Sequence, residues 1–384
     1  MWRSIASNAL SLLIVVLLLC GGVILWGKGQ YTTAGPLDQA ICLRVETGSN
    51  MRRVSDELAN QGAITNGRIF LAGADYEDKA SKLKAGSYLI TDGSSMQQIV
   101  DQITTSGRST CGTEVNYRIG ILSAELQVRE LDPATNRYVE VLAHDPAEGE
   151  APAEYAEVAA QSDVRYRVTL AEGVTSWQVV DALKSAEFLT GEVSNLPAEG
   201  SLAPDSYELT RGADRAELIA RMELAQAELI AELWPARAEG LPLANEQEAL
   251  ILASIIEKET GVSSEREQVS SVFINRLNQG IRLQTDPTVI YGITNGQGSL
   301  GRGLRQSELR RETPYNTYVI DALPPTPIAN PGRASIEAAL NPANTDFIFF
   351  VADGTGGHAF AKTLAEHNRN VAEWRKIEAE RANQ

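Results

Sequence analysis

Histidine and cysteine are both scarce in this chain, whose 384 residues include three of each. No Cys-x-x-Cys pair occurs, and His144, His358 and His367 are not paired at helical spacing. The residue types that usually bind a structural or catalytic metal are therefore not grouped in the sequence. We expect neither a metal site nor a cofactor.

Basic residues are also in the minority, with 34 Lys and Arg against 50 Asp and Glu and a formal net charge of −16. A protein that binds duplex nucleic acid needs a basic face, so this composition argues against that class. The stretch "ADGTGGHAF" lacks the Gly-x-x-x-x-Gly-Lys-Ser/Thr pattern of a phosphate loop, which argues against nucleotide binding. It predicts instead two strands joined by a glycine-rich hairpin, with His358 and Phe360 on one face.

Charged residues are absent from Ser4 to Gly27. The apolar run from Ala9 to Gly27 is about as long as a helix needs to cross a bilayer. The positive charge at Arg3 and at the N-terminal amine predicts a cytoplasmic N-terminus, with the rest of the chain outside. A cleaved signal peptide is the alternative, but the run is long for one and no A-x-A site follows it. We therefore expect an uncleaved anchor over residues 4–27.

Two of the three cysteines, Cys42 and Cys111, follow this segment, whereas Cys20 lies inside it. Disulfides persist outside the cytoplasm, so Cys42 and Cys111 could pair with each other. The sequence leaves the paired and unpaired states equally open.

Two stretches of the chain resemble each other, and each reads as strand, helix, strand, helix. We interpret them as two copies of a small α+β module. The aligned pairs are Gly48 and Gly173, Val54 and Val179, Asp56 and Asp181, Leu58 and Leu183, Tyr88 and Tyr207, Thr91 and Thr210, and Gly93 and Gly212.

The segment between the two copies has another character. The alternating stretches "ELQVREL" and "RYVEVLA", joined by "DPATN", predict a hairpin. The following "DPAEGEAPAEYAE" is rich in Pro, Ala and Glu and predicts a mobile, acidic loop. We divide the chain into an anchor (1–28), a linker (29–41), a first module (42–105), a β-rich acidic insertion (106–165), a second module (166–240) and a C-terminal domain (241–384).

The stretch "ILASIIEKET" places two carboxylates, Glu257 and Glu259, at the end of a helix that is otherwise apolar. The helix dipole and the apolar surroundings both disfavour a negative charge there, so we expect a raised carboxyl pKa. A carboxylic acid that is still protonated near neutral pH can donate a proton to a glycosidic oxygen. The small side chains of Ala253 and Ser254 would leave room for a substrate, and Gly261 is a candidate for the residue that ends the helix. The pattern does not choose between the two glutamates, and an ordinary helix end with solvated charges remains the simpler reading.

Further polar and aromatic motifs follow in the C-terminal domain. In "LQTDPTVIYG", Asp286 and Gln284 could line a sugar site, or the motif could form a turn or helix cap. In "TPYNTY", Tyr315 and Tyr318 offer flat faces and hydroxyls that suit sugar rings. The stretch "LPPTPIANPG" is nearly uncharged and rich in proline, and it predicts a rigid, shaped loop.

Six motifs in this order, "ASIIEKET", "SVFINRL", "LQTDPTVIYG", "PYNTY", "LPPTPIANPG" and "FVADGTGGHAF", closely resemble those of the endolytic murein transglycosylases, the YceG-like (MltG) family. The resemblance is strongest from Leu250 to Trp374. It implies an α+β fold with a single N-terminal transmembrane helix, two small LysM-like α+β modules and a C-terminal α+β YceG-like catalytic domain. The long acidic insertion departs from shorter members of the family.

The resemblance also implies an activity and a location. It implies a single-pass protein of the cell inner membrane whose catalytic part is periplasmic. Such a lyase cleaves between N-acetylmuramic acid and N-acetylglucosamine within glycan strands, leaves 1,6-anhydro ends, and terminates nascent strands. Its partners would be peptidoglycan glycan strands and peptidoglycan synthases.

The family's catalytic glutamate carries over to Glu257, which would serve first as acid and then as base. A hydrolytic muramidase, with Asp286 or Glu259 as a second carboxylate, is one alternative. A scaffold that binds peptidoglycan without catalysis is another. From motif position and chemistry, the candidates for the glycan cleft are Gln284, Asp286, Tyr291, Tyr315, Asn316 and His358, of which Asp286 and Asn316 could instead cap helices or brace loops.

Overall fold

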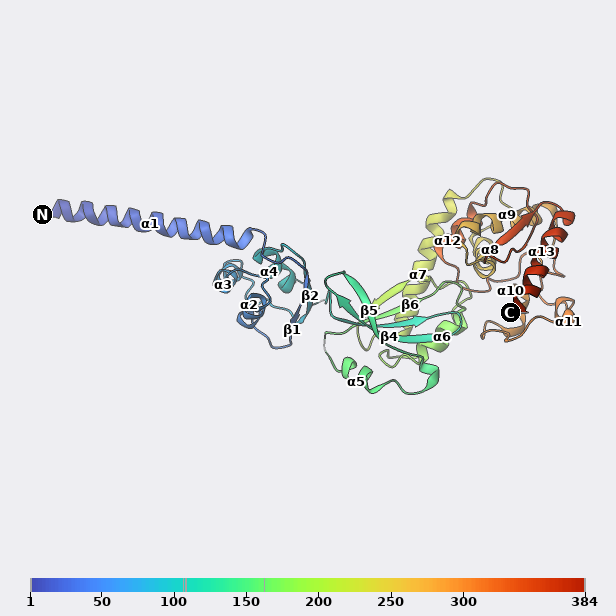
Figure 1. Cartoon of the computed structure of the whole chain (residues 1–384), viewed down its shortest axis with the longest axis horizontal. Helices are drawn as coiled ribbons and strands as arrows, with labels where there is room; N and C mark the ends of the chain where they lie inside the picture. The colour runs from blue at the N-terminus through green and yellow to red at the C-terminus, as the bar shows by residue number, and fades with distance from the viewer. Residues whose placement is uncertain (1, 106, 108, 162, 383–384) are drawn as a thin grey trace. The chain divides into compact units, whose positions relative to one another are not determined.

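The computed structural model describes residues 2–105, 107, 109–161 and 163–382, and the fold is α+β as predicted (Figure 1). The chain divides into two units. The N-terminal unit comprises Met1–Val115, Gln127–His144 and Glu150–Arg165, and the C-terminal unit comprises Asn116–Leu126, Asp145–Gly149 and Tyr166–Gln384. The six segment boundaries given above are finer than this division and stay predictions.

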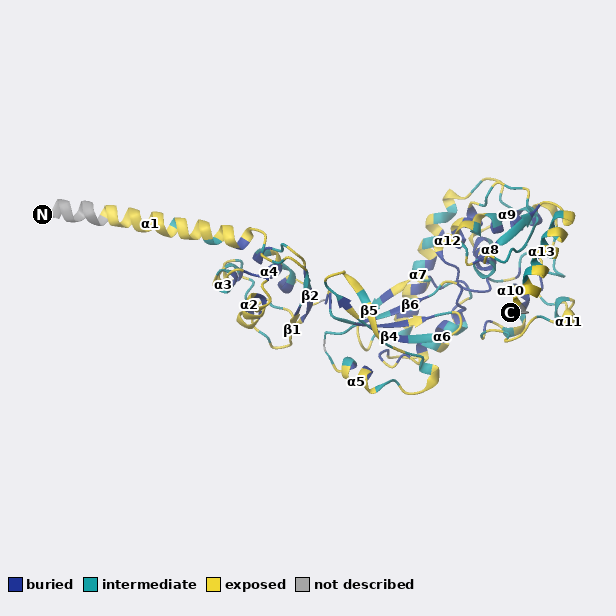
Figure 2. Cartoon of the chain, in the orientation of Figure 1, coloured by how far each residue is buried: buried dark blue, intermediate teal, exposed yellow. Residues whose placement is uncertain are grey.

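Helix α1 (Trp2–Thr32) contains the predicted membrane segment, and the side chains from Leu10 to Trp26 are almost all exposed (Figure 2). The stretch Leu10–Thr32 is long and apolar enough to cross a membrane, which fits an anchor or a signal sequence. The side chains of residues 4–9 lie outside the described part. Near the end of the helix, Tyr31 is only 6% exposed and belongs to the core of the first module.

The first module follows, and its two strands form an antiparallel pair in which Leu43 lies opposite Tyr88. Its helices pack on this pair through Val54, Leu58 and Ile99, which are almost completely buried. The elements are β1 (Ile41–Val45), α2 (Met51–Asn60), α3 (Gly67–Tyr76), β2 (Gly86–Ile90) and α4 (Met96–Thr105). A disulfide joins Cys42 to Cys111. The sequence left the paired and unpaired states open, and the structure shows the paired state.

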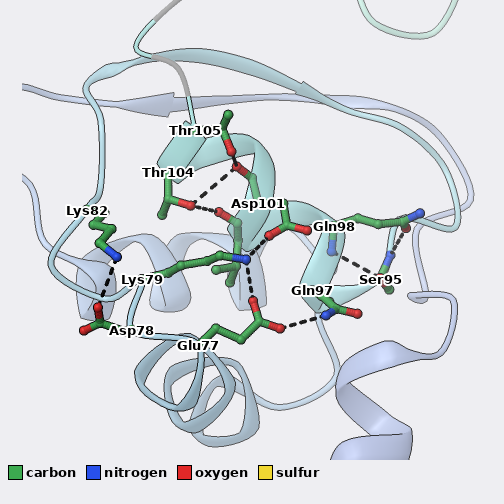
Figure 3. A network of polar contacts seen from close by, with 11 residues as sticks. Glu77, Asp78, Lys79, Lys82, Ser95, Gln97, Gln98, Asp101, Thr104 and Thr105 are labelled. Atoms are coloured by element: carbon green, nitrogen blue, oxygen red, sulfur yellow. Dashed lines mark hydrogen bonds and ion pairs between the residues drawn. The ribbon is translucent and has the colours of Figure 1, made fainter.

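A polar network ties the end of α3 to α4 (Figure 3). Lys79 donates to both Asp101 and Glu77, and these hydrogen bonds raise the pKa of Lys79. Glu77 also accepts a 2.7 Å hydrogen bond from the Gln97 amide. The network in Figure 3 contains none of the predicted site residues.

A five-stranded sheet follows, with the strand order β5-β4-β3-β6-β7. The predicted hairpin is confirmed, because β4 and β5 are neighbours in this sheet. The acidic segment is not an irregular loop throughout, since it contains a 3₁₀ turn (η1, Pro146–Glu148) and a short helix (α5, Ala153–Ala159) that buries Tyr155. The strands are β3 (Thr113–Ile119), β4 (Ala124–Asp132), β5 (Arg137–His144), β6 (Arg165–Leu170) and β7 (Ser206–Leu209).

The second module consists of β6, α6 (Ser176–Lys184), β7 and α7 (Arg215–Leu233). Val168 lies opposite Tyr207, which matches the pairing of Leu43 with Tyr88 in the first module. In both copies the tyrosine hydroxyl donates to the carbonyl four residues earlier. The structure therefore supports the duplication. The copies differ in that α3 has no helical counterpart between α6 and β7.

The rest of the C-terminal unit is built around α8 (Glu246–Glu259), which Asn245 caps through its side chain. All residues from Ala249 to Ile256 are buried, because α7, α9, α10 and α12 pack around this helix. The apolar run in the sequence is thus a core helix that is enclosed on all sides. The other elements are α9 (Arg266–Gln279), α10 (Asp286–Thr294), α11 (Gln306–Leu309), α12 (Arg333–Leu340), β8 (Phe349–Ala352), β9 (His358–Ala361) and α13 (Leu364–Ala382), with 3₁₀ turns η2 (Trp234–Ala236) and η3 (Ser263–Glu265).

Candidate active site

Glu257 lies in the last turn of α8, where the helix leaves the core, and its side chain is 6% exposed. Its Oε2 accepts a 3.0 Å hydrogen bond from the backbone N–H of Gly332. Its Oε1 lies 3.6 Å from Nη2 of Arg266, at the start of α9. A buried helix thus presents one carboxyl to one backbone donor and one guanidinium.

The proline-rich loop 323–332 brings Gly332 to this carboxyl because it is fixed at two points. The N–H of Ile328 donates a 3.0 Å hydrogen bond to Oγ of Ser254, which lies one turn before Glu257. The side chain of Asn330, which is completely buried, donates to the Val174 carbonyl and accepts from the N–H of Leu202. The segment forms a loop, as predicted. The backbone N–H of Gly332, at its end, donates to the candidate acid Glu257.

Ala253 and Ser254 do not leave room for a substrate, so that expectation is wrong. Both are completely buried in the core, and the Ser254 hydroxyl is used by Ile251 and Ile328. Gly261 does not end α8 in a left-handed conformation either. The helix ends at Glu259, and the extended residue Thr260 follows.

A second carboxylate, Glu172, lies beside Glu257. It belongs to the turn after β6, and its Oε2 is 3.6 Å from Nη2 of Arg266, the same atom that faces Glu257. Burial raises the pKa of Glu172, and the negative charge of Glu257 raises it further, while Arg266 acts in the opposite direction. Sequence reasoning missed this residue because it lies in the second module, far from the motifs of the C-terminal domain.

The turn after β6 approaches α8 closely. Gly173 has a left-handed φ of +77°, and its carbonyl accepts a 3.2 Å hydrogen bond from Nζ of Lys258. A Cβ on Gly332 would lie 1.8 Å from Oε1 of Glu172. An alanine at position 332 would therefore require the Glu172 side chain to move.

Lys258 borders a cavity of about 380 Å³ that also reaches α6 and α10. Burial lowers the pKa of Lys258, although the charges of Glu257 and Glu199 oppose this shift. Glu257 itself does not line the cavity. Other lining residues include Thr175, Gln178, Pro287, Ile290, Tyr291 and Ile328.

Two of the predicted cleft residues, Tyr291 and Tyr315, lie together, with ring centroids 5.0 Å apart. The Tyr291 hydroxyl donates a 3.0 Å hydrogen bond to Oε2 of Glu199. Burial raises the pKa of Glu199, and hydrogen bonds from Ser176 and Tyr291 partly offset this. Tyr291, a predicted binding residue, is therefore hydrogen-bonded to Glu199, a half-buried acid that was not among the sequence candidates.

Glu259, the other glutamate of the motif, belongs to a separate polar cluster. Its carboxylate accepts from the Thr285 hydroxyl, and burial raises its pKa. The nearby charge of Asp286 adds to this, while His358 opposes it. Asp286 is exposed and accepts a 2.6 Å hydrogen bond from the Tyr318 hydroxyl.

The remaining candidates differ in what they touch. Gln284 is exposed, with a left-handed φ of 50°, and His358 pairs with Glu265 at 2.8 Å between Nδ1 and Oε2. Asn316 is completely buried, and its amide donates to three carbonyls at and just after the end of α11. It therefore braces the end of α11, which fits the structural uses that the sequence left open, and it is too buried to contact a substrate directly.

Within the described part of the chain, no hydrogen bond or ion pair joins any of the six cleft candidates to Glu257. The polar partners of Glu257 are instead the guanidinium of Arg266 and the backbone N–H of Gly332. The described residues also contain no group of three or more His, Cys, Asp or Glu side chains that could hold a metal ion.

Comparison with known proteins gave consistent matches. The model of the YceG-like family matches residues 43–136 and 147–373. A Bacillus subtilis (strain 168) protein named endolytic murein transglycosylase is 27% identical over 362 residues, which cover 92% of this chain and 90% of the relative. A Streptococcus pneumoniae (serotype 2, strain D39) protein of the same name is 24% identical over 356 residues, covering 87% of this chain and 58% of the relative.

Among solved structures, a YceG-like protein from Listeria monocytogenes matches with 26% identity and a TM-score of 0.45. The match covers 86% of this chain and 99% of the other.

Proposed function

Because the chain belongs to the YceG-like family and is an enzyme of the lytic transglycosylase type, we propose that it cleaves peptidoglycan glycan strands at internal positions. The bond broken would be the glycosidic bond between N-acetylmuramic acid and N-acetylglucosamine. The observation that carries this proposal is the Glu257 carboxyl, which emerges from a buried helix between the Gly332 N–H and Arg266. A single carboxyl held in this way suits proton transfer.

In the proposed reaction Glu257 first gives its proton to the glycosidic oxygen, which leaves as a hydroxyl of N-acetylglucosamine. The carboxylate that results is stabilised by the Gly332 N–H and by Arg266. It then takes the proton of the C6 hydroxyl of the same muramic acid. The C6 oxygen bonds to C1 and closes a 1,6-anhydro ring, so Glu257 regains its proton and no water is consumed.

For substrate contacts we propose the region around Tyr291 and Tyr315 and the neighbouring cavity bordered by Lys258. A cavity with apolar walls and a few polar groups suits part of a sugar or of its substituent. Gln284, Asp286 and His358 stay proposed contacts of the glycan strand. Asn316 is excluded from direct contact by its burial.

The location is a further part of the proposal. Helix α1 would act as an uncleaved anchor in the inner membrane, with the catalytic part in the periplasm. The enzyme would there cut nascent strands and limit their elongation, with peptidoglycan synthases as partners. The two modules would be LysM-like elements that approach the glycan.

A hydrolytic muramidase is the second candidate, and Glu172 is the observation that favours it. Hydrolysis usually requires two carboxylates that flank the bond. Glu172 and Glu257 each have an oxygen 3.6 Å from the same guanidinium nitrogen of Arg266. Glycan strands digested with the full-length protein distinguish the two reactions by mass spectrometry. The proposed reaction gives 1,6-anhydro ends, whereas hydrolysis gives ordinary reducing ends. An absence of cleavage would support a binding scaffold.

A further inference from the structure

The second module reaches into the active site through one side chain. We propose that Glu172 is a positioning residue that holds Arg266 away from a tight pair with Glu257, so that Glu257 can carry the proton it donates. The second module would then be a part of the catalytic centre as well as a glycan-binding attachment. This inference rests on the proposed function of Glu257.

The geometry around Arg266 carries the argument. Its Nη2 lies 3.6 Å from Glu172 Oε2 and also 3.6 Å from Glu257 Oε1. A direct hydrogen bond between a guanidinium and a carboxylate is shorter, at about 2.7–2.9 Å. The guanidinium is therefore shared between the carboxylates and is tightly bound to neither. With Glu172 absent, Arg266 could close on Glu257 and hold it as the anion.

Burial makes this sharing effective. The Arg266 side chain is 14% exposed, that of Glu257 is 6% exposed, and that of Glu172 is 44% exposed. Water therefore screens the pair of Arg266 and Glu257 less than it would at the surface. The charged groups that face Glu257 are Arg266 from α9, Glu172 from the turn after β6 and its neighbour Lys258.

The backbone of the turn is fixed against the site. The Gly173 N–H donates a 2.9 Å hydrogen bond to the Asn330 carbonyl, and the Asn330 N–H donates one of the same length to the Val174 carbonyl. Lys258 donates to the Gly173 carbonyl. Glu172 is thus presented from a turn that is bonded to both the proline-rich loop and the helix of Glu257.

The internal repeat gives an independent comparison. Gly173 aligns with Gly48, and both have a left-handed φ, of +77° and +83°. The residue before this glycine is Thr47 in the first module and Glu172 in the second. The glycine conformation is the same, and an acid directly before the glycine occurs only in the copy that belongs to the unit of Glu257.

The test uses the full-length chain and steady-state digestion of glycan strands over a range of pH. We expect Glu172→Gln to lower kcat near neutral pH by about tenfold or more, with KM unchanged. The alkaline limb of the kcat profile should move to lower pH, because Arg266 then favours the anion of Glu257. Glu172→Asp should restore part of the activity. Glu187→Gln, an exposed glutamate of the same module, is the matched control and should behave as wild type.

A double variant separates positioning from a loss of structure. If Glu172 acts by restraining Arg266, adding Arg266→Gln to Glu172→Gln should move the alkaline limb back toward the wild-type position. Wild-type kcat and pH profile in Glu172→Gln would overturn the inference. A rise in KM alone would overturn it too, as would a fall in activity that only follows the folded fraction while the pH profile stays in place.

The Glu257→Gln variant keeps the two proposals distinguishable. If it is inactive while Glu172→Gln is unchanged, only the role of Glu172 fails. If Glu257→Gln keeps wild-type activity, the proposed catalytic role of Glu257 fails, and the inference drawn from it fails as well.

Discussion

The backbone N–H of Gly332 lies 3.0 Å from Oε2 of Glu257 and joins the end of the proline-rich loop to the end of the central helix. The loop is anchored one turn earlier on the same helix, at Ser254. Any change that moves this loop should therefore change the orientation of the candidate acid. This relationship leads to predictions for residues that do not themselves contact a substrate.

The first prediction concerns Gly332→Ala. The added Cβ would lie 1.8 Å from Oε1 of Glu172, so the loop or the carboxylate must shift. Because the Glu172 side chain is partly exposed and can move, we expect little change in stability but a loss of most of kcat as Glu172 is displaced from Arg266, measured by thermal unfolding and glycan digestion. Gly303→Ala is the control, because no atom lies near the Cβ that it adds. Equal activity of the two variants would contradict the account.

The second prediction concerns Asn330, whose buried side chain bonds to Val174 and Leu202. Asn330→Ala leaves the Leu202 N–H without its partner, at a cost of about 1–3 kcal/mol, whereas the Val174 carbonyl keeps the hydrogen bond from the backbone N–H of residue 330. Because the same loop carries Gly332, kcat per folded molecule should fall as well. Asn316→Ala removes an equally buried amide elsewhere, so it should lower stability but keep kcat per folded molecule. Unchanged kcat in Asn330→Ala would show that the loop does not orient the acid.

The third prediction is a pH dependence of stability that comes from Glu199. Burial raises its pKa in the folded state above the ordinary 4.5, so the folded state binds more protons than the unfolded state. The protonated Glu199 carboxyl therefore contributes its full stabilisation of the folded state below pH 4.5, and this contribution is lost as the pH rises through the raised pKa of the folded state. Relative to Glu199→Gln, the wild type should lose stability over this window. Thermal unfolding at a series of pH values measures this, with exposed Glu187→Gln as control, and parallel curves for wild type and Glu199→Gln would refute it.

The fourth prediction concerns the disulfide between Cys42 and Cys111, which are 69 residues apart in the sequence. A cross-link of this span restricts the unfolded chain, and losing it should cost about 2–5 kcal/mol. Reductant should therefore lower the unfolding temperature of the wild type but not that of the Cys42→Ser, Cys111→Ser double variant. Cys20→Ser, which changes the exposed free cysteine, should keep the wild-type response. Insensitivity of the wild type to reductant would contradict the pairing.

Local patterns predicted much of the fold. The apolar run of "ILASIIEKET" lies in helix α8, and the alternating stretches around "DPATN" become β4 and β5. The repeat was readable because the matched residues, Tyr88 and Tyr207 among them, keep the same strand pairing. The acidic segment was less predictable, since the burial of Tyr155 in α5 depends on tertiary contacts.

The candidate site was predictable only in part. Glu257 was found through its motif. Of the groups around it, Glu172 and Gly332 come from segments that are distant in sequence, whereas Arg266 begins the next helix. The residue pattern of α8 alone could not identify them, because other helices pack around α8 and leave no solvent-exposed face along its apolar run. Asn316 was ambiguous in the sequence, and it is a buried brace because its amide bonds to backbone carbonyls.

The central claim is that Glu257 donates the proton that breaks the glycan strand and then recovers it from the C6 hydroxyl. The most direct measurement is mass spectrometry of glycan strands digested by the full-length wild type and by Glu257→Gln. The account predicts 1,6-anhydro ends at internal cleavage positions for the wild type and no cleavage for the variant. Ordinary reducing ends, or wild-type cleavage by Glu257→Gln, would contradict it.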